Sequence, residues 1–403
     1  MKIGIIREGK VPSDARVPLI PPQCRSLMKK YDNVQIFVQP SPHRCFSDEE
    51  YERAHINLKE DLSNCDILFG VKEVPKNMLI PEKTYFFFSH TIKMQPYNRE
   101  LLQEILRKRI RLIDYEVITD DKDNRLIAFG RFAGIVGAHN GLRAYGLRTG
   151  LYEMKPVHTF KDFNAIKEFY DTLTLPPMKI VLTGGGRVSR GAMEVLDYLK
   201  VRKVKPKEFL KKEFDHPVYV QLNTEDLYYR KEDKHFNAFD FYDHPEKYQI
   251  RFSPYLKVAD IMMNGIYWDP KAPVFFSREQ MAGPDFHIQT IADITCDIEG
   301  SIPSTVRPST IMDPFYGFDP VQWQETEPFR QGAVDVMAVD NLPNELPRDA
   351  SEAFGIMLMK YVWDELFKKQ SDMLDRATIA RDGRLTPKFE YLHDYVNGKN
   401  VSH

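Results

Sequence analysis

Six ionisable side chains follow short apolar runs in the first 120 residues. The runs are rich in β-branched and aromatic residues, and helical or loop segments separate them, which predicts a parallel sheet. Ligands of such sheets bind beyond the carboxyl ends of the strands, where side chains and loops converge. The side chains predicted at or beyond that edge are Arg16, Lys72, Glu73, His90, Lys93 and Glu116.

Lys72 and His90 have the residue types of an acid/base pair. If they share a cleft, the charge on one depresses the pKa of the other toward neutrality. Glu73 and Glu116 could tune these pKa values or bind an ammonium group. For any one of these residues, an ordinary charged position at a loop edge is the simpler interpretation, but their common location favours a site.

A glycine-rich turn occurs in the middle of the chain, in "MKIVLTGGGRVSRGAMEVLDYL", residues 178–199. A strand-like run precedes Gly184 and Gly186, and an apolar pattern at helical spacing follows. Backbone N–H groups at a helix N-terminus can hold a pyrophosphate, and glycines allow its close approach. The next glycine, Gly191, comes one residue later than in the usual fingerprint. Two interpretations stay open, a dinucleotide site and a tight strand–helix turn.

The next strand-like run, "VRKVKP", bears on the choice of nucleotide. An acid at the end of this strand would bind a free ribose 2′-hydroxyl, but the run carries Arg202, Lys203 and Lys205. A 2′-phosphate suits these residues, which favours NADP over NAD. A solvated basic strand edge is the alternative.

The surrounding elements divide into two groups. Predicted strands of the first lobe are "KIGIIRE", "VQIFVQP", "DILFGVKEV", "TYFFFSH" and "IRLIDYEVI", and 98–109 is predicted to be a helix. The segment 134–154 suits a helix that leads to a second lobe, with further strands in "VADIMMNGIYW", "IQTIADITCDI" and "AVDVMAVDNL". An ordered insertion is expected at about 206–253. A helix with its start marked by Ser351 returns the chain to the first lobe.

Composition excludes several classes of protein. The 403 residues are 42% hydrophobic and 28% charged with a net charge of −2, which is typical of a globular protein and indicates neither a nucleic-acid nor a membrane partner. The start of the chain does not resemble a signal peptide, so we expect a cytoplasmic protein. Its four cysteines are scattered, which favours neither a disulfide framework nor a metal site.

Several blocks resemble a known family. "TYFFFSHTIKMQPYNRELLQEILRKRIRLIDYE", "LIAFGRFAGIVG", "TGGGRVSRGA" and "MNGIYW" resemble the lysine-ketoglutarate reductase region of the bifunctional enzyme of lysine breakdown. "VKEVP", "DARVPLIPP" and "VMAVDNLPNELPRDASEAF" resemble the monofunctional, lysine-forming saccharopine dehydrogenase. Both belong to a superfamily with alanine dehydrogenase and the transhydrogenase alpha subunit. The resemblance covers residues 1 to about 368.

The resemblance implies an α/β protein of two Rossmann-like domains with parallel sheets around a central cleft. Residues 1–138 and 345–403 would form the substrate domain, and 139–344 the dinucleotide-binding domain. The implied reaction joins L-lysine and 2-oxoglutarate as an imine, which a nicotinamide cofactor reduces to saccharopine, or the reverse. The insertion follows the bifunctional type, and no second dehydrogenase region follows in this sequence, so a stand-alone reductase is expected.

The resemblance also assigns roles to individual residues. Lys72 and His90 match the acid/base pair of the family. Positions that bind substrate or set pKa values are matched by Arg16, Glu73, Lys93, Glu116 and Arg125. Cofactor-binding positions are matched by Gly184, Gly186, Arg187, Val188, Gly191, Asn264, Gly265, Ile266, Asp297, Asp340, Asn341 and Leu342.

Two other functions remain open. An alanine dehydrogenase type would use the same Lys/His pair on a small amino acid, and Asp297 matches an acid of that type. The extra cations Lys93 and Arg125 favour the larger substrate, because saccharopine has three carboxylates and alanine has one. A nucleotide-binding regulator without catalysis is the third possibility, and the presence of both Lys72 and His90 argues against it. The sequence does not indicate an oligomeric state.

Overall fold

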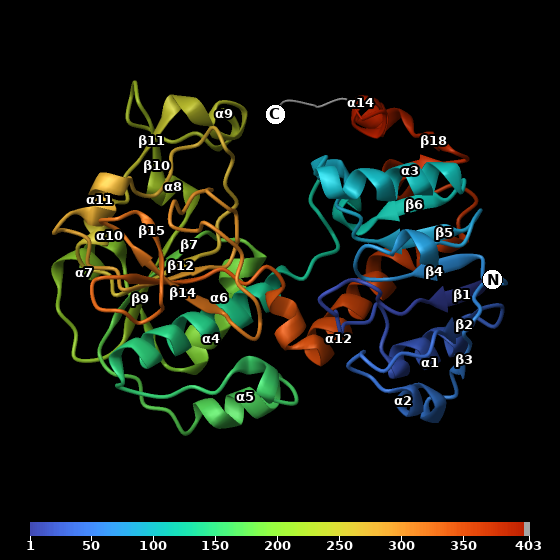
Figure 1. Cartoon of the computed structure of the whole chain (residues 1–403), viewed down its shortest axis with the longest axis horizontal. Coiled ribbons are helices and arrows are strands. Elements are labelled where there is room, and N and C mark those ends of the chain that lie inside the picture. The colour runs from blue at the N-terminus through green and yellow to red at the C-terminus, as the bar shows by residue number, and fades with distance from the viewer. Residues whose placement is uncertain (399–403) are drawn as a thin grey trace. The chain divides into compact units, whose positions relative to one another are not determined.

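A computed structural model describes residues 1–398 (Figure 1). The chain forms two compact units, one of Met1–Phe129 with the C-terminal part from Pro347, the other of Gly130–Leu346. The sequence-based boundaries were 138/139 and 344/345. The first boundary lies earlier because the helix α4 (Gly130–Thr149) belongs as a whole to the second unit, where it packs along α6 (Arg187–Tyr198).

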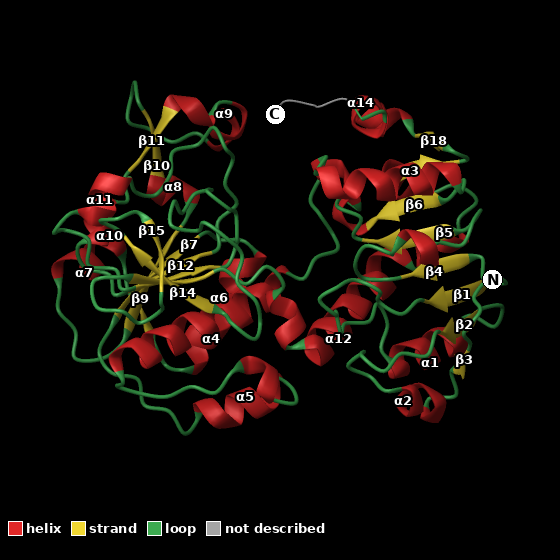
Figure 2. Cartoon of the chain, viewed as in Figure 1, coloured by secondary structure: helices red, strands yellow, loops and turns green. Residues whose placement is uncertain are grey.

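Unit 1 contains an eight-stranded sheet (Figure 2). Six neighbouring strands are parallel, and the last two, which were not predicted from the sequence, extend the sheet in antiparallel fashion. Across the sheet the strands are β18 (Arg384–Leu385), β17 (Thr378–Arg381), β6 (Arg111–Asp114), β5 (Thr84–Phe87), β4 (Ile67–Phe69), β1 (Lys2–Ile5), β2 (Gln35–Val38) and β3 (Asn57–Leu58).

Helices cover both faces of this sheet. Successive residues of a strand point to opposite faces, so Phe86 of β5 packs in one core cluster with α1, whereas Tyr85 and Phe87 pack in another with α3. Leu102 on the apolar side of α3 is fully buried. Helices of unit 1 are α1 (Pro21–Lys30), α2 (Asp48–Arg53), α3 (Arg99–Arg107), α12 (Pro347–Met357), α13 (Asp372–Arg376) and α14 (His393–Val396).

The helix α12 begins one turn earlier than predicted. Ser351 was expected to start it, but the helix starts at Pro347, because proline is favoured at the first helical position. The Ser351 hydroxyl, within the helix, donates to the Pro347 carbonyl and accepts from the backbone N–H of Val17. The helix therefore ties the C-terminal part of unit 1 to the segment after β1.

Unit 2 contains a second eight-stranded sheet, in which β7, β9, β8, β12, β13 and β16 are parallel. The antiparallel pair β14 and β15 forms its edge. Across the sheet the strands are β15 (Gln324–Thr326), β14 (Phe315–Asp319), β16 (Val334–Met337), β13 (Thr290–Asp293), β12 (Ile261–Asn264), β7 (Lys179–Thr183), β9 (Val218–Leu222) and β8 (Arg202–Lys203).

The strand beside β7 is not the one predicted from the sequence. "VRKVKP" contributes β8 at the edge of the sheet, and β9 lies between it and β7. The stretch 206–253, which was interpreted as a single insertion, thus contains a core strand. Beyond β9 it forms the excursion 224–253, with α8 (Thr224–Leu227), the two-stranded sheet of β10 (Tyr228–Arg230) and β11 (Tyr248–Ile250), and α9 (Ala238–Asp243).

Aromatic packing keeps this excursion ordered, as its composition predicted. The rings of Tyr228, Phe241 and Tyr248 are buried. The centroid of the Phe241 ring lies 4.6 Å from that of Tyr228 and 5.0 Å from that of Tyr248. Other helices of unit 2 are α5 (Phe163–Tyr170), α7 (Pro206–Lys211), α10 (Ser253–Leu256) and α11 (Arg278–Ala282). Among residues 1–398, no helix has both the length and the apolar character needed to cross a bilayer.

Candidate functional site

The predicted acid/base residues lie at the carboxyl ends of four neighbouring parallel strands in unit 1. Lys72 and Glu73 follow β4, His90 follows β5, and Glu116 follows β6, while the loop after β1 carries Arg16. We call the ends of β1, β4, β5 and β6 the charged edge.

His90, Glu73 and Lys10 form a chain of contacts. His90 Nδ1 lies 2.5 Å from Glu73 Oε1, and Lys10 Nζ lies 3.1 Å from Glu73 Oε2. Although burial alone would raise it, the pKa of Glu73 falls to about 2, because the hydrogen bond and charge of His90 and the charge of Lys10 stabilise the carboxylate. Since Nδ1 is engaged by Glu73, Nε2 is the ring nitrogen that can serve a substrate.

His90 adopts a left-handed backbone conformation with φ of +53°. A non-glycine residue with positive φ is uncommon, and such strained positions gather at functional sites. The ring stacks on Phe88, with 6.3 Å between the centroids. Backbone, carboxylate and aromatic ring together fix the direction of the imidazole.

Lys72 is a largely buried amine. Its pKa is lowered to about 8, mainly by burial and further by the charges of Arg16 and Lys10. A substantial fraction of the amine is therefore neutral near pH 8. The buried carboxyl of Glu8 fixes the backbone here, because it accepts the N–H groups of Val71 at 2.7 Å and Lys72 at 2.8 Å.

Arg16 is buried against the protein's own carboxylate. Its Nε and one terminal nitrogen donate to the two oxygens of Asp14, at 2.9 and 2.5 Å. The guanidinium also lies 4.2 Å above the ring of Phe129. The guanidinium is therefore held in one plane and orientation.

Lys93 and Arg125 share the carboxylate of Glu116. Their nitrogens lie 3.8 and 3.5 Å from Glu116 Oε1. The other oxygen, Oε2, is buried and accepts no hydrogen bond from residues 1–398. Two cations on one carboxylate leave a net positive charge, and the buried Oε2 retains capacity to accept a proton donor.

The predicted cofactor residues lie at the carboxyl ends of four neighbouring strands in unit 2, which we call the glycine edge: the ends of β7, β12, β13 and β16. Gly184, Gly186, Arg187 and Val188 follow β7, Gly265 and Ile266 follow β12, Asp297 follows β13, and Asp340, Asn341 and Leu342 follow β16. Asn264 is the last residue of β12.

The glycine turn joins β7 to α6. Gly184 has φ of +92°, which a side chain would strain, and a Cβ there would lie 2.9 Å from the Gly265 carbonyl oxygen. Gly186 precedes the first residue of α6, and a Cβ on it would meet nothing within 4 Å, so this side of the turn is open. Gly191 packs instead against α4, because a Cβ there would lie 1.9 Å from the Arg131 carbonyl oxygen.

A buried polar network supports the glycine edge from below. The Asn264 amide accepts a hydrogen bond from Thr183 at 2.7 Å and donates to Asp293 and Ser301, both at 3.0 Å. The other Asp293 oxygen accepts from Thr305 at 2.7 Å. Asn264 thus links the ends of β7, β12 and β13, while Asp297 and Asp340 are exposed beyond them.

The end of β9 lies against the glycine turn. Gln221 donates through Nε2 to the Gly184 carbonyl at 3.0 Å, and a Cβ on Gly185 would lie 2.7 Å from Asn223 Oδ1. Lys203, from the neighbouring β8, donates to Gln221 Oε1 at 2.6 Å. The position where an acid would bind a ribose 2′-hydroxyl is therefore occupied by amides and approached by a lysine.

Glu8, Lys10 and Asp14 were not predicted from the sequence. All three precede Arg16 in the segment "REGKVPSDAR", and the predicted position of Arg16 beyond the first strand was the available signal. Pairing of Lys10 with Glu73 depends on the adjacency of β1 and β4, which the sequence does not reveal.

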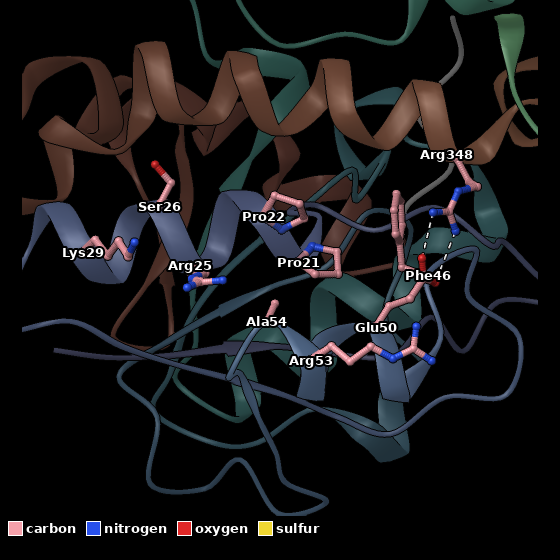
Figure 3. A pocket seen from close by; sticks show the side chains of 10 residues that line it. All are labelled: Pro21, Pro22, Arg25, Ser26, Lys29, Phe46, Glu50, Arg53, Ala54 and Arg348. Carbon is pink, nitrogen blue, oxygen red and sulfur yellow. Dashed lines mark hydrogen bonds and ion pairs between the residues drawn. The ribbon is translucent and has the colours of Figure 1, made fainter.

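A separate cavity of about 570 Å³ lies in unit 1 between α1 and α2 (Figure 3). None of the predicted site residues lines it. Arg348 faces Glu50 across its rim, and they form an ion pair of 2.8 Å. This cavity is therefore distinct from the charged edge.

The first domain and the whole chain both resemble known proteins. Residues 4–136 match the family model "Alanine dehydrogenase/PNT, N-terminal domain". Alpha-aminoadipic semialdehyde synthase of Mus musculus, named as mitochondrial, is 32% identical over 97% of this chain and 47% of its own length. Lysine-forming saccharopine dehydrogenase of Emericella nidulans is 25% identical over 89% of this chain and 90% of its own.

The chain is a homologue of these two enzymes. The synthase of Arabidopsis thaliana is also 32% identical, over 97% of this chain and 41% of its own length. The chain thus spans about half the length of these synthases.

Among solved structures, an L-alanine dehydrogenase has a TM-score of 0.64 at 16% identity, covering 98% of this chain and 100% of that one. A transhydrogenase from Sinorhizobium meliloti has a TM-score of 0.58 at 12% identity, covering 96% and 98%. These likenesses confirm the predicted α/β fold.

Proposed function

We propose that the protein is a nicotinamide-dependent oxidoreductase that interconverts L-lysine plus 2-oxoglutarate with saccharopine. The observation that carries the proposal is the charged edge, where a largely buried lysine with a pKa of about 8 and a histidine oriented by a carboxylate follow adjacent strands. The homology to saccharopine dehydrogenases supports the choice of substrates.

Lys72 and His90 would move the protons of imine formation. Neutral Lys72 takes a proton from the substrate ε-ammonium, so that the nitrogen can attack the carbonyl carbon of 2-oxoglutarate. The attacking nitrogen passes a proton to the carbonyl oxygen, which gives the carbinolamine. His90, in its protonated form, then gives a proton from Nε2 to the carbinolamine hydroxyl, which leaves as water as the protonated imine forms. Glu73 holds Nδ1, which leaves Nε2 to face the substrate.

Arg16, Lys93 and Arg125 would recognise the substrate carboxylates. The Arg16 guanidinium is oriented by Asp14 and Phe129, and the excess positive charge around Glu116 attracts a second carboxylate. The unpartnered Oε2 of Glu116 suits a substrate ammonium group. This number of cations supports a substrate with several carboxylates over alanine.

The glycine edge fits a dinucleotide. Gly186 leaves the start of α6 accessible, Gly184 takes the positive φ of the turn, and Gly265 lies against the same turn, so backbone N–H groups there would hold the pyrophosphate. A nicotinamide bound at this edge would supply the hydride that reduces the imine carbon. Gly191 contributes through helix packing, and Asn264 through the network that fixes the strand ends.

We propose NADP as the preferred cofactor. The lysine-rich end of β8 supports this choice through Lys203, which reaches Gln221 at the end of β9. Lys203→Ala is expected to weaken NADPH binding about tenfold, the loss of one charge-assisted hydrogen bond, without changing NADH binding. Arg202→Ala is the matched control, because Arg202 pairs with Glu208. Equal weakening of both dinucleotides would contradict the assignment.

The decisive assay follows oxidation of NADPH and NADH at 340 nm with 2-oxoglutarate plus lysine, beside pyruvate plus ammonia. Oxidation that requires both lysine and 2-oxoglutarate is expected. Turnover with pyruvate and ammonia alone would assign the alanine dehydrogenase type, and dinucleotide binding without any turnover would indicate a regulator. The cytoplasmic location stays a prediction, since the mouse relative is named as mitochondrial.

A further inference from the structure

The excursion 224–253 forms an aromatic pocket together with the loop after β12. The pocket has a volume of about 190 Å³. Its lining residues are Tyr228, Phe241, Tyr242, Pro245, Tyr267, Trp268, Asp269 and Ala272. Sites for whole drug-sized ligands have volumes of roughly 300–1,000 Å³. The smaller volume of this pocket suits a single flat ring system.

The two walls of this pocket follow β9 and β12, the strands on either side of β7, which leads into the glycine turn. One wall follows β9, whose last contacts before the excursion are those of Gln221 and Asn223 with the turn. The other wall starts two residues after Gly265, which itself contacts Gly184. Two residues of extended chain span at most about 7 Å, so Tyr267 begins within the reach of one nucleoside from the turn.

The side chains of the pocket have the chemistry of a base-binding site. Tyr242 and Tyr267 are 61% and 78% exposed, unlike the buried Tyr228 and Phe241 behind them, so their faces are available for stacking. The indole N–H of Trp268 donates to the carbonyls of Ala272 and Pro273, at 3.2 and 3.3 Å, which fixes the ring. Asp269 adds a carboxylate that can accept from an exocyclic amino group.

We propose that the excursion and the loop after β12 bind the adenine ring of the dinucleotide in this aromatic pocket. The inference rests on the proposed function, because it requires that the glycine turn hold a pyrophosphate. It assigns a role to the excursion, which lies outside the eight-stranded sheet: it supplies the aromatic surface for the base. The exposed rings of Tyr242 and Tyr267 stack on adenine, and Asp269 accepts its amino group.

The test measures ligand binding by calorimetry with the full chain. Ligands are NADPH, ADP-ribose, which keeps the adenine and lacks nicotinamide, and reduced nicotinamide mononucleotide, which lacks adenine. Tyr242→Ala and Tyr267→Ala are each expected to weaken ADP-ribose binding by about 5- to 150-fold, the range for loss of a base-stacking ring, and to leave the mononucleotide unaffected. Phe239→Ala is the matched control, since Phe239 lies on the same helix as Tyr242, is 87% exposed and does not line the pocket.

The outcomes distinguish failure of the adenine assignment from failure of the proposed function. Unchanged ADP-ribose affinity in both tyrosine variants, with a wild type that binds NADPH, overturns the adenine assignment and leaves the proposed function in place. Equal weakening of ADP-ribose binding and mononucleotide binding also overturns the adenine assignment, because the substitution would then lower affinity for ligands with and without adenine alike. A wild type that binds no dinucleotide overturns the proposed function together with the inference.

Discussion

The charged edge of unit 1 and the glycine edge of unit 2 differ in the kinds of groups that make their contacts. At the charged edge, ionisable side chains pair with one another: His90 with Glu73, Lys10 with the same carboxylate, and Arg16 with Asp14. At the glycine edge the contacts belong to backbone, amides and hydroxyls, and the buried Asp293 is surrounded by neutral hydrogen-bond donors. One edge is organised to move protons and recognise charge, the other to admit a large ligand close to the backbone.

Both edges belong to predominantly parallel eight-stranded sheets. Their difference therefore arises from the few residues beyond the strand ends, since one architecture supports unrelated chemistries. Substitutions at the charged edge should change rates and pH profiles, whereas substitutions at the glycine edge should change dinucleotide affinity or stability.

The largest effect is expected at the acid/base pair. Lys72→Met and His90→Gln should each lower kcat by about 10²- to 10⁴-fold, the usual contribution of a positioned acid or base. Methionine keeps the length of the buried side chain, so the fold should persist. Steady-state kinetics with saturating lysine and 2-oxoglutarate measures the change. Lys76→Met, on an exposed lysine paired with Glu100, is the control, and near-normal turnover of both variants would disprove the assignment.

Two glycines separate stability from ligand binding at the glycine edge. Gly191→Ala places a Cβ 1.9 Å from the Arg131 carbonyl oxygen, and overpacking of this kind should lower the free energy of unfolding by about 1–3 kcal/mol or more. Gly186→Ala meets no neighbouring atom within 4 Å, so its stability should match the wild type, while its affinity for NADPH falls.

Thermal unfolding and dinucleotide titration of both variants test this separation. A stable Gly191→Ala protein would show that α4 and α6 can move apart. Unchanged NADPH affinity in Gly186→Ala would show that the open side of the turn does not face the ligand.

The sequence revealed the charged edge better than the glycine edge. Lys72 and His90 could be found because each directly follows a short apolar strand, and parallel strands bring such positions together. The choice of "VRKVKP" failed because order along the chain does not give order across a sheet: β9 inserts between β8 and β7. The pairing of Lys10 with Glu73 was invisible for the same reason.

The smallest predicted effect concerns this missed lysine. The charge of Lys10 helps to lower the pKa of Lys72, so Lys10→Met should raise that pKa from about 8 toward the ordinary lysine value, by less than about one unit. If neutral Lys72 is the reacting form, the acidic limb of the pH profile of kcat/KM must move to higher pH by the same amount. Glu73 should stay ionised, because His90 still stabilises its carboxylate.

The direction of this shift distinguishes two roles for Lys10. A residue that only bound substrate would change KM without moving the limb, and a residue that only supported the fold would lower stability at every pH. Kinetics of Lys10→Met between pH 6 and 10, beside the Lys76→Met control, measures the limb directly. A limb that moves to lower pH would contradict the assignment. Loss of Lys10 ends its repulsion of Lys72 and also frees the Glu73 carboxylate, and each of these changes raises the pKa of Lys72.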